Sequence, residues 1–234
     1  MSTAPKTSRI SVIIPARNEA AALPATLAAL ADAEVHEVIV ADGESRDATA
    51  AIARQHGATV VGSPAGRGRQ LNAGAAAASG DILLFLHADT LLPPAFAAEV
   101  RRILADPAVS AGAFRLAIAD RRPGYRLIEL GTNLRARLGQ LPYGDQALFL
   151  RATDFRAMGG FADLPLLEDL EMVSRLRQRG NIRLAASAVQ TSARRWQRWG
   201  RLRTTWRNQL MLWGFLLGVA PDRLARWYLR GNRG

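Results

Sequence analysis

Short apolar runs alternate with longer Ala-rich or amphipathic stretches over the first hundred residues of the chain. The apolar runs predict strands at 9–14, 37–41, 58–61 and 81–86, and the stretches between and after them predict helices at 19–31, 45–56, 69–78 and 93–104. Ser45 is expected to cap the second helix, and Gly57 and Gly80 to end the second and third. This alternation is typical of an α/β fold with a parallel sheet and right-handed crossovers.

The rhythm changes after Pro107, where strands are expected at 110–118 and 146–150 and helices at 125–138 and 168–179. At 234 residues and 49% hydrophobic composition, the chain can bury a sizeable core. We therefore predict one domain over 1–196, with a first half at about 9–106 and a second half at about 107–196.

Residues 197–234 are expected to form a basic, amphipathic helical extension. Ten Arg and one acid, Asp222, lie between 194 and 234, so this stretch carries most of the net charge of +11. Such charge favours an anionic partner: phospholipid, nucleic acid or a phosphorylated substrate. Eleven uncharged residues at 210–220 are too few to span a bilayer, which needs about 20. Packing on the domain, an oligomer contact, a helix at a membrane surface and a plain solvated face all remain open.

The absence of Cys excludes disulfides, zinc–thiolate sites and thiol nucleophiles. Three scattered histidines argue against a His-based metal site. Residues 1–8 are polar, so no signal peptide is expected. We expect a cytoplasmic protein, with peripheral attachment to the inner face of the membrane through the tail as the alternative.

Two acids follow apolar runs directly. Asp89 comes after the run at 81–86, and Asp42 after the run at 38–41. Ligands of open α/β sheets bind at the carboxyl ends of strands, and carboxylates are the hard oxygen ligands that Mg2+ and Mn2+ prefer. Together these acids predict a site for a metal-bound nucleotide.

Two further segments carry weaker signals. In Pro15-Ala16-Arg17-Asn18-Glu19, a strand end and a helix start present free backbone N–H groups, although Glu19 is equally suited to a first helical turn. Gly43 permits a tight turn after Asp42, and Asp42 has the alternative of capping the next helix. In Gly66-Arg67-Gly68-Arg69, arginines can pair with phosphate, and a flexible surface loop is the alternative.

Taken together, Pro15-Ala16-Arg17-Asn18-Glu19, Asp42-Gly43, the Arg69/Asn72 helix and His87-Ala88-Asp89 resemble a family-2 glycosyltransferase of the short, single-domain bacterial type. The resemblance implies the GT-A fold, a Rossmann-like, mostly parallel sheet flanked by helices. It also implies the following roles on the nucleotide side: Pro15, Glu19 and Asp42 hold the nucleoside, Arg69 and Asn72 line the base or diphosphate, and Asp89 binds the metal. His87 stands where the family's Asp-x-Asp motif has its first acid, and it either bonds the ribose or packs.

The second half carries the remaining motifs of the family. Tyr143-Gly144-Asp145-Gln146 resembles the segment that lines the donor sugar and the acceptor, which assigns Gly144 and Asp145 to that region. Glu168-Asp169 resembles the Glu-Asp step at a helix start, and the resemblance implies that Asp169 is the catalytic base. An ordinary solvated helix start is the alternative.

Ser192-Ala193-Arg194-Arg195-Trp196 resembles the Arg-Trp motif of polysaccharide synthases in this family. By that resemblance Arg195 contacts the leaving diphosphate and Trp196 stacks on a sugar. Anchoring of the tail on the domain is the alternative for both residues.

The resemblance implies an inverting glycosyltransferase that uses a nucleotide-diphosphate sugar, most commonly a UDP-sugar, with Mg2+ or Mn2+. The acceptor is expected to be lipid-linked or a small molecule, a homo-oligomer remains open, and no nucleic acid is expected as a partner. The alternatives are a nucleotidyltransferase that makes sugar nucleotides and a basic protein that binds membrane or nucleic-acid surfaces.

Overall fold

The computed structural model describes residues 8–230, apart from the side chains of 195, 229 and 230. The strands are β1 (Ile10–Ala16), β2 (Glu37–Asp42), β3 (Thr59–Gly62), β4 (Ile82–Phe85), β5 (Thr90–Leu91), β6 (Val109–Ile118), β7 (Phe149–Arg151) and β8 (Asn181–Thr191). The helices are α1 (Leu23–Ala28), α2 (Thr49–Gln55), α3 (Arg67–Ala77), α4 (Phe96–Leu104), α5 (Pro123–Gly139), the 3-10 turn η1 (Gly144–Gln146), α6 (Ala152–Ala157), α7 (Glu168–Arg179), α8 (Arg194–Trp199), α9 (Arg201–Leu216) and α10 (Pro221–Arg230).

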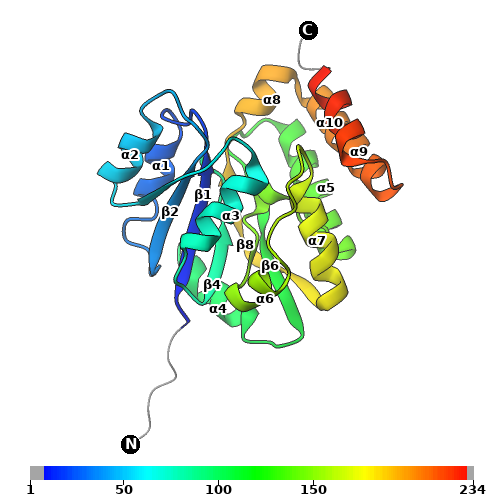
Figure 1. Cartoon of the computed structure of the whole chain (residues 1–234). Coiled ribbons are helices and arrows are strands. Elements are labelled where there is room, and N and C mark those ends of the chain that lie inside the picture. Colours follow the sequence, from blue (N-terminus) through cyan, green and yellow to red (C-terminus); the bar gives the residue numbers. More distant parts are fainter. Residues whose placement is uncertain (1–7, 231–234) are drawn as a thin grey trace, which may run out of the picture.

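The described strands form one sheet in the order β3-β2-β1-β4-β7-β6-β8-β5 (Figure 1). Strands β3, β2, β1 and β4 are parallel, β7 runs antiparallel to both of its neighbours, and β6 and β8 are parallel. The predicted mostly parallel sheet is therefore confirmed. The antiparallel β7 joins the parallel first half to the mixed second half.

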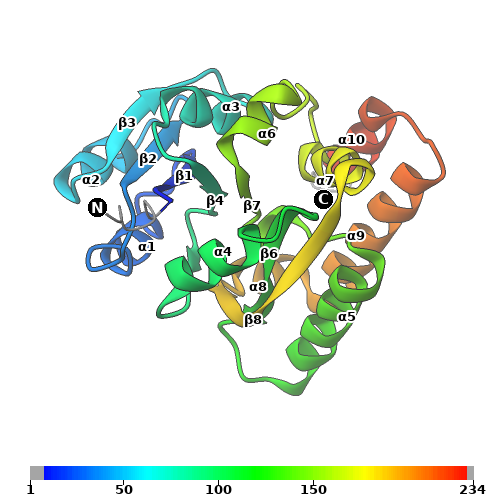
Figure 2. The same cartoon turned by 90° about the horizontal axis from the view of Figure 1, so that it is seen from below.

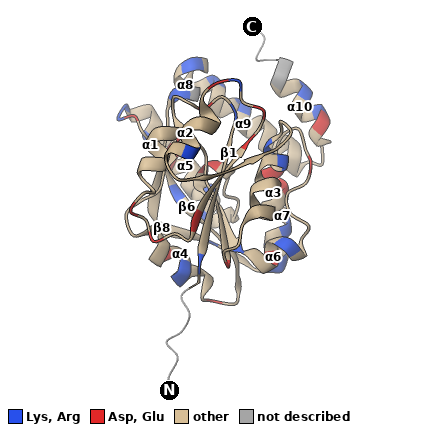
Figure 3. Cartoon of the chain, turned by 60° about the vertical axis from the view of Figure 1, so that its left-hand side comes forward, with Lys and Arg blue, Asp and Glu red and all other residues tan. Residues whose placement is uncertain are grey.

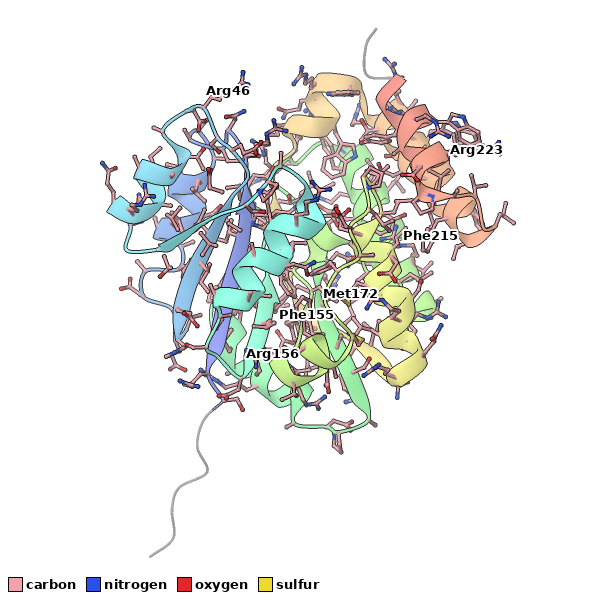
Figure 4. The ribbon with its side chains drawn as sticks, in the orientation of Figure 1. Arg46, Phe155, Arg156, Met172, Phe215 and Arg223 are labelled. Carbon is pink, nitrogen blue, oxygen red and sulfur yellow. The ribbon has the colours of Figure 1, made fainter. Side chains whose placement is uncertain are left out.

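Both faces of the sheet are covered by helices, which explains why β1 is apolar at nearly every position. Successive residues of this strand alternate between the two faces: Val12 and Ile14 pack on the side of α1, α2 and α4, whereas Ile13 packs on the side of α3, α6 and α7. Figure 2 shows the sheet seen from below with helices on both sides, and Figure 4 shows Phe155 and Met172 pointing inward from α6 and α7.

The order in which strands are added to the sheet reverses between β1 and β4. It first adds β2 and β3 on one side of β1, and then returns to place β4 on the other side. Open α/β sheets bind ligands at such a switch point, outside the carboxyl ends of the strands. Pro15 of β1 and the His87–Asp89 turn after β4 lie at this place.

The tail packs on the second half through its last two helices. Met211, Leu212 and Leu224, from α9 and α10, form a small buried cluster with Leu167 and Leu170 at the start of α7. Packing therefore accounts for part of the uncharged segment at 210–220. No helix in the described part of the chain is long and apolar enough to cross a membrane. The division of the chain at residue 196 stays a prediction.

One local expectation was wrong, one turn has its left-handed residue at the next position, and one strand was missed. Ser45 does not cap α2, which begins at Thr49; its hydroxyl instead accepts a hydrogen bond from the backbone N–H of Asn18 at 3.0 Å. Gly43 does not adopt a positive φ, and the left-handed residue of this turn is Glu44. β8 was missed because its Ala- and Ser-rich sequence has weak strand propensity, and its pairing with β6 decides its conformation.

Candidate functional site

A cavity of about 430 Å3 opens at the switch point between β1 and β4. This volume lies within the usual range of small-molecule sites and could hold part of a nucleotide sugar. The predicted site residues that line it are Pro15, Glu19, His87, Asp89, Asp145, Glu168, Asp169 and Trp196. They come from both halves of the chain, so the fold brings together most of the residues predicted from separate motifs.

Asp169 lies in the first turn of α7 and is held by backbone N–H groups. One carboxylate oxygen accepts from the N–H of Gly144 at 2.7 Å, and the other accepts from the N–H of Leu170 at 2.8 Å. Leu167, in the left-handed conformation, turns the chain just before the helix. Since main-chain donors cannot swing away, the Asp169 carboxylate has a fixed orientation at the wall of the cavity.

Asp89 pairs with the side chain of Arg194, which follows β8 about a hundred residues later in the chain. The strand β5, which follows Asp89, pairs with β8, so Ser192 donates its N–H to the carbonyl of Asp89 at 3.1 Å. Arg194, two residues on, places its Nε 2.9 Å from an Asp89 carboxylate oxygen. The same guanidinium binds both carboxylate oxygens of Glu19 at 2.7 Å. Arg194 thus pairs with two predicted site acids at once.

Glu168 is buried beside Asp169, with the Nε of Arg67 at 3.3 Å from its carboxylate. Burial and the nearby Asp169 carboxylate raise the pKa of Glu168 above its usual range, and Arg67 opposes this shift. Two adjacent carboxyl groups in unlike environments are a common arrangement in acid–base sites.

Gly144 lies between Asp169 and His87. A Cβ atom at this position would meet a carboxylate oxygen of Asp169 at 3.1 Å and Nε2 of His87 at 3.3 Å. The glycine therefore allows the 3-10 turn to approach α7 closely enough for its N–H to reach Asp169.

Asp42 lies at the end of β2, outside the residues that line the main cavity. One oxygen accepts from the backbone N–H of Ser45 at 3.2 Å, whereas the buried Oδ1 has no hydrogen-bond partner in the described part of the chain. Gly43 beside it permits close approach of the Gln70 amide, which donates to the carbonyls of Ala16 and Ala41. Asp42 thus serves a local turn and keeps one acceptor oxygen unused.

Arg69 and Asn72 do not lie at the main cavity. Arg69 forms a bidentate ion pair with Asp163, with both distances at 2.8 Å. The Asn72 amide bonds the carbonyl and the N–H of Phe161. Both side chains hold the 161–163 loop against α3, an arrangement that motif reasoning along the sequence could not see. Of the two arginines on this helix, it is Arg67, at its start, that lines the cavity.

Trp196 is almost fully buried and meets the ring of Tyr125 edge to face, with centroids 6.3 Å apart. This packing supports the anchoring alternative, although Trp196 also contributes to the cavity lining. The side chain of Arg195 lies outside the described residues. The basic residue that the structure brings to the site is its neighbour Arg194.

Several lining residues had no signal in the sequence analysis. Asn208 and Met211 of α9 and Tyr228 of α10 close the cavity from the tail side. Their contribution depends on how the tail folds back onto α7, which no local motif reports. Tyr143, by contrast, belongs to a segment that the sequence motif had marked; it lines the cavity, and the guanidinium of Arg135 lies 3.5 Å from its ring centroid.

The donor set suits a divalent ion that is shared with a ligand. No cluster of three His, Cys, Asp or Glu side chains in the described residues could hold a metal by itself. Mg2+ and Mn2+ are commonly held by one or two carboxylates together with substrate phosphates, and this matches the single carboxylate of Asp89. The Arg194 guanidinium, 2.9 Å away, already places one positive charge beside this carboxylate.

Residues 11–159 match the family described as Glycosyl transferase family 2. Among curated proteins, an uncharacterised glycosyltransferase of Mycobacterium tuberculosis is 40% identical over 81 residues, which is 34% of this chain and 36% of the relative. A 4,4'-diaponeurosporenoate glycosyltransferase of Staphylococcus haemolyticus is 41% identical over 95 residues, 37% of this chain and 25% of the relative. The matched region thus spans well under half of either relative.

Solved structures share the fold. A mannosyltransferase from Pyrobaculum calidifontis, in complex with GDP-Man and Mn2+, has a TM-score of 0.62 at 21% identity, covering 80% of this chain and 57% of that one. Glucosyl-3-phosphoglycerate synthase from Mycobacterium tuberculosis, in complex with Mn2+, UDP and glucosyl-3-phosphoglycerate, has a TM-score of 0.58 at 25% identity, covering 79% of this chain and 70% of that one. These likenesses agree with the GT-A fold predicted from the sequence.

Proposed function

The chain belongs to glycosyl transferase family 2, and from that premise we propose that it moves a sugar from a nucleotide-diphosphate sugar to an acceptor hydroxyl with inversion at the anomeric carbon. One observation carries the proposal: a single cavity is lined both by Asp89, after β4, and by Asp169, at the start of α7. The first acid suits the diphosphate side of a donor, and the second suits a general base.

Asp169 is proposed as the base. The acceptor oxygen attacks the anomeric carbon as its proton passes to Asp169, and the bond from that carbon to the diphosphate oxygen breaks, with its electron pair leaving on the nucleoside diphosphate. The backbone N–H groups of Gly144 and Leu170 orient the carboxylate for this transfer. One base and no covalent step imply inversion.

Asp89 is proposed to hold Mg2+ or Mn2+ together with the donor diphosphate. The ion supplies charge neutralisation for the leaving group when it is bound. Structural relatives were solved with Mn2+ and GDP-Man or UDP, which supports this choice of ion. Arg194, once the ion replaces its contact with Asp89, would add positive charge beside the same phosphates.

Pro15, Asp42 and His87 are proposed to contact the nucleoside. The unused Oδ1 of Asp42 suits a base N–H or a ribose hydroxyl. His87 lines the cavity beside Gly144 and suits the ribose. Glu19, Asp145 and Glu168 complete the polar lining on the diphosphate and sugar sides.

Calorimetric titration with UDP, GDP, CDP and dTDP, each with and without Mn2+, tests the proposal. We expect one nucleoside diphosphate to bind, and to bind more tightly with Mn2+. Binding of none of the four to folded protein would overturn the proposed function.

A further inference from the structure

In the described part of the chain, the exposed large apolar side chains gather on a set of neighbouring helices. Among the side chains that the structure describes, the exposed large hydrophobic ones all belong to α5, α9, the residue that follows α9, and α10. They are Leu127, Leu130, Leu134, Leu138, Leu202, Trp206, Leu210, Trp213, Leu216, Leu217 and Trp227. Scattered single apolar residues need no explanation, but a gathered set of this kind marks an interaction site.

The exposed residues of α9 and its end form a stripe. Leu202, Trp206 and Leu217 are 88%, 71% and 79% exposed, and Leu210 and Trp213 lie between them. At 3.6 residues per turn, these five positions fall within an arc of about 80°, and Leu216, the sixth exposed position, widens the stripe to about 120°. They occupy one face of the helix, as in amphipathic helices that lie at an interface.

The opposite face of α9 is already occupied. Met211 and Leu212 are buried against the start of α7, and Asn208 and Met211 line the cavity. The stripe therefore serves neither the core nor the proposed catalytic site. Figure 4 shows Arg223 of α10 at the outer edge of the molecule, far from Arg46 near α2, whereas Phe215 of α9 packs against the cluster at the start of α7.

α5 adds a second stripe beside the first. Its leucines at 127, 130, 134 and 138 fall within an arc of similar width, and its other face is held by the buried Tyr125 and Ala136. α5 contacts α9, and Arg201 of α9 lies over the ring of Tyr125. Figures 1 and 2 both show the two helices side by side.

The charge around the stripes is positive. α9 carries Arg201, Arg203 and Arg207 and no acid. α8 carries no acid, and two of its three Arg lie beyond Arg194, which pairs with Glu19 and Asp89 at the cavity; α10 has a single acid, Asp222. Figure 3 shows the blue of Lys and Arg recurring on α8 and α10. Long arginine side chains can lie along an apolar surface and keep their charge at its polar edge.

We infer that the outer faces of α5 and α9 dock on an anionic lipid bilayer. Leu and Trp side chains enter the interface between headgroups and acyl chains, and the arginines contact the phosphate headgroups. The charge distinguishes this partner from a second copy of the chain, because pairing two such faces would bring like charges together. The cavity lies against the inner face of α9, so docking through the outer face does not cover it.

Co-sedimentation of the full chain with vesicles tests the inference. Vesicles of phosphatidylcholine alone are compared with vesicles that contain phosphatidylglycerol, at low salt and in about 0.5 M NaCl, where charges are screened within a few ångströms. We expect binding to the anionic vesicles that weakens with salt. The variant Trp206→Ser/Trp213→Ser should bind at least about tenfold more weakly, and Arg203→Gln should bind severalfold more weakly.

Arg46→Gln is the matched control, because Arg46 is exposed on the loop before α2, away from the stripes, and should leave binding unchanged. Unfolding midpoints by circular dichroism establish that each variant is folded. Failure of the folded wild type to bind anionic vesicles would overturn the inference. So would a wild-type dimer in analytical ultracentrifugation that the double Trp variant dissociates, because the face would then join two copies of the chain.

Discussion

The two walls of the cavity hold their acids in different ways. Asp169 receives two backbone N–H groups, from Gly144 and Leu170, whereas Asp89 receives the side chain of Arg194. Backbone donors stay in place throughout a reaction. A half-exposed arginine at the start of a short helix can turn away, and a different cation can take its position.

The difference separates a fixed group from an exchangeable one. A general base must be oriented before the acceptor arrives, since misplacement by a fraction of an ångström slows the transfer. An ion-binding carboxylate needs a temporary counter-charge while the site is empty, because otherwise Asp89 and Glu19 would face each other without a cation. The structure provides each acid with the support that its proposed role requires.

Asp169→Asn is expected to have the largest effect, because it removes the proposed base. The amide can keep the hydrogen bond from Gly144 but cannot take a proton, so hydrolysis of UDP-glucose, with water as the acceptor, should fall by about 10²–10⁴. Release of UDP measures the rate. Glu171→Gln is the control, because Glu171 shares the first turn of α7 but pairs with Arg175 and should retain the wild-type rate. A wild-type rate in Asp169→Asn would show that Asp169 is not the base.

Gly144→Ala tests whether the close approach of Gly144 orients the Asp169 carboxylate. The new Cβ would press on the Asp169 carboxylate and on His87, at 3.1 and 3.3 Å, and the same hydrolysis rate should fall by about tenfold. Gly131→Ala is the control: its Cβ meets nothing within 4 Å, and the helical alanine should raise the free energy of unfolding by about 0.5–1 kcal/mol with no loss of rate. Equal rates in the two variants would mean that the contact with Gly144 does not orient Asp169.

Arg194→Gln tests the exchangeable side. Without the guanidinium, Asp89 and Glu19 attract a cation more strongly, so the affinity for Mn2+ alone should rise by about two- to fivefold. Electron paramagnetic resonance of free Mn2+ measures this without any turnover. Arg69→Gln removes an arginine that pairs with Asp163 instead, and should leave the affinity unchanged. Weaker Mn2+ binding in Arg194→Gln would show that the arginine does not compete with the ion.

The smallest expected effect is on stability against pH. The raised pKa of Glu168 means that its protonated form is favoured in the fold, so its contribution to stability is complete below the ordinary value of 4.5 and is lost as pH rises through the folded pKa. Glu168→Gln cannot ionise, so its unfolding midpoint relative to wild type should increase as pH rises from about 4.5 toward neutrality. Thermal melts of both proteins measure the difference. A difference that is constant with pH would contradict the shift.

Much of the first half follows from the sequence because each signal there is local. The run before Asp89 is apolar at every position, since β4 is buried on both faces, and the acid follows at the strand's carboxyl end. In the second half, α7 also begins and ends where its pattern predicts, at Glu168 and Arg179, because acids open it and a glycine follows it.

The rest depends on contacts between distant segments. Arg194 reaches Asp89 only because β5 pairs with β8, and the sequence analysis selected its neighbour Arg195 instead. Arg69 and Asn72 were assigned to the ligand, yet their partners, Asp163 and Phe161, lie about ninety residues away in the chain. The tail's contribution to the cavity depends in the same way on its packing against Leu167 and Leu170.

The central claim is that, in one cavity, Asp89 holds the metal ion and Asp169 acts as the base. Calorimetry tests this division most directly, with the nucleoside diphosphate that binds the wild type titrated into Asp89→Asn and Asp169→Asn, each with and without Mn2+. The account predicts that Asp89→Asn loses the gain in affinity that Mn2+ confers, whereas Asp169→Asn keeps it. Loss of the gain in both variants, or in neither, would contradict the account.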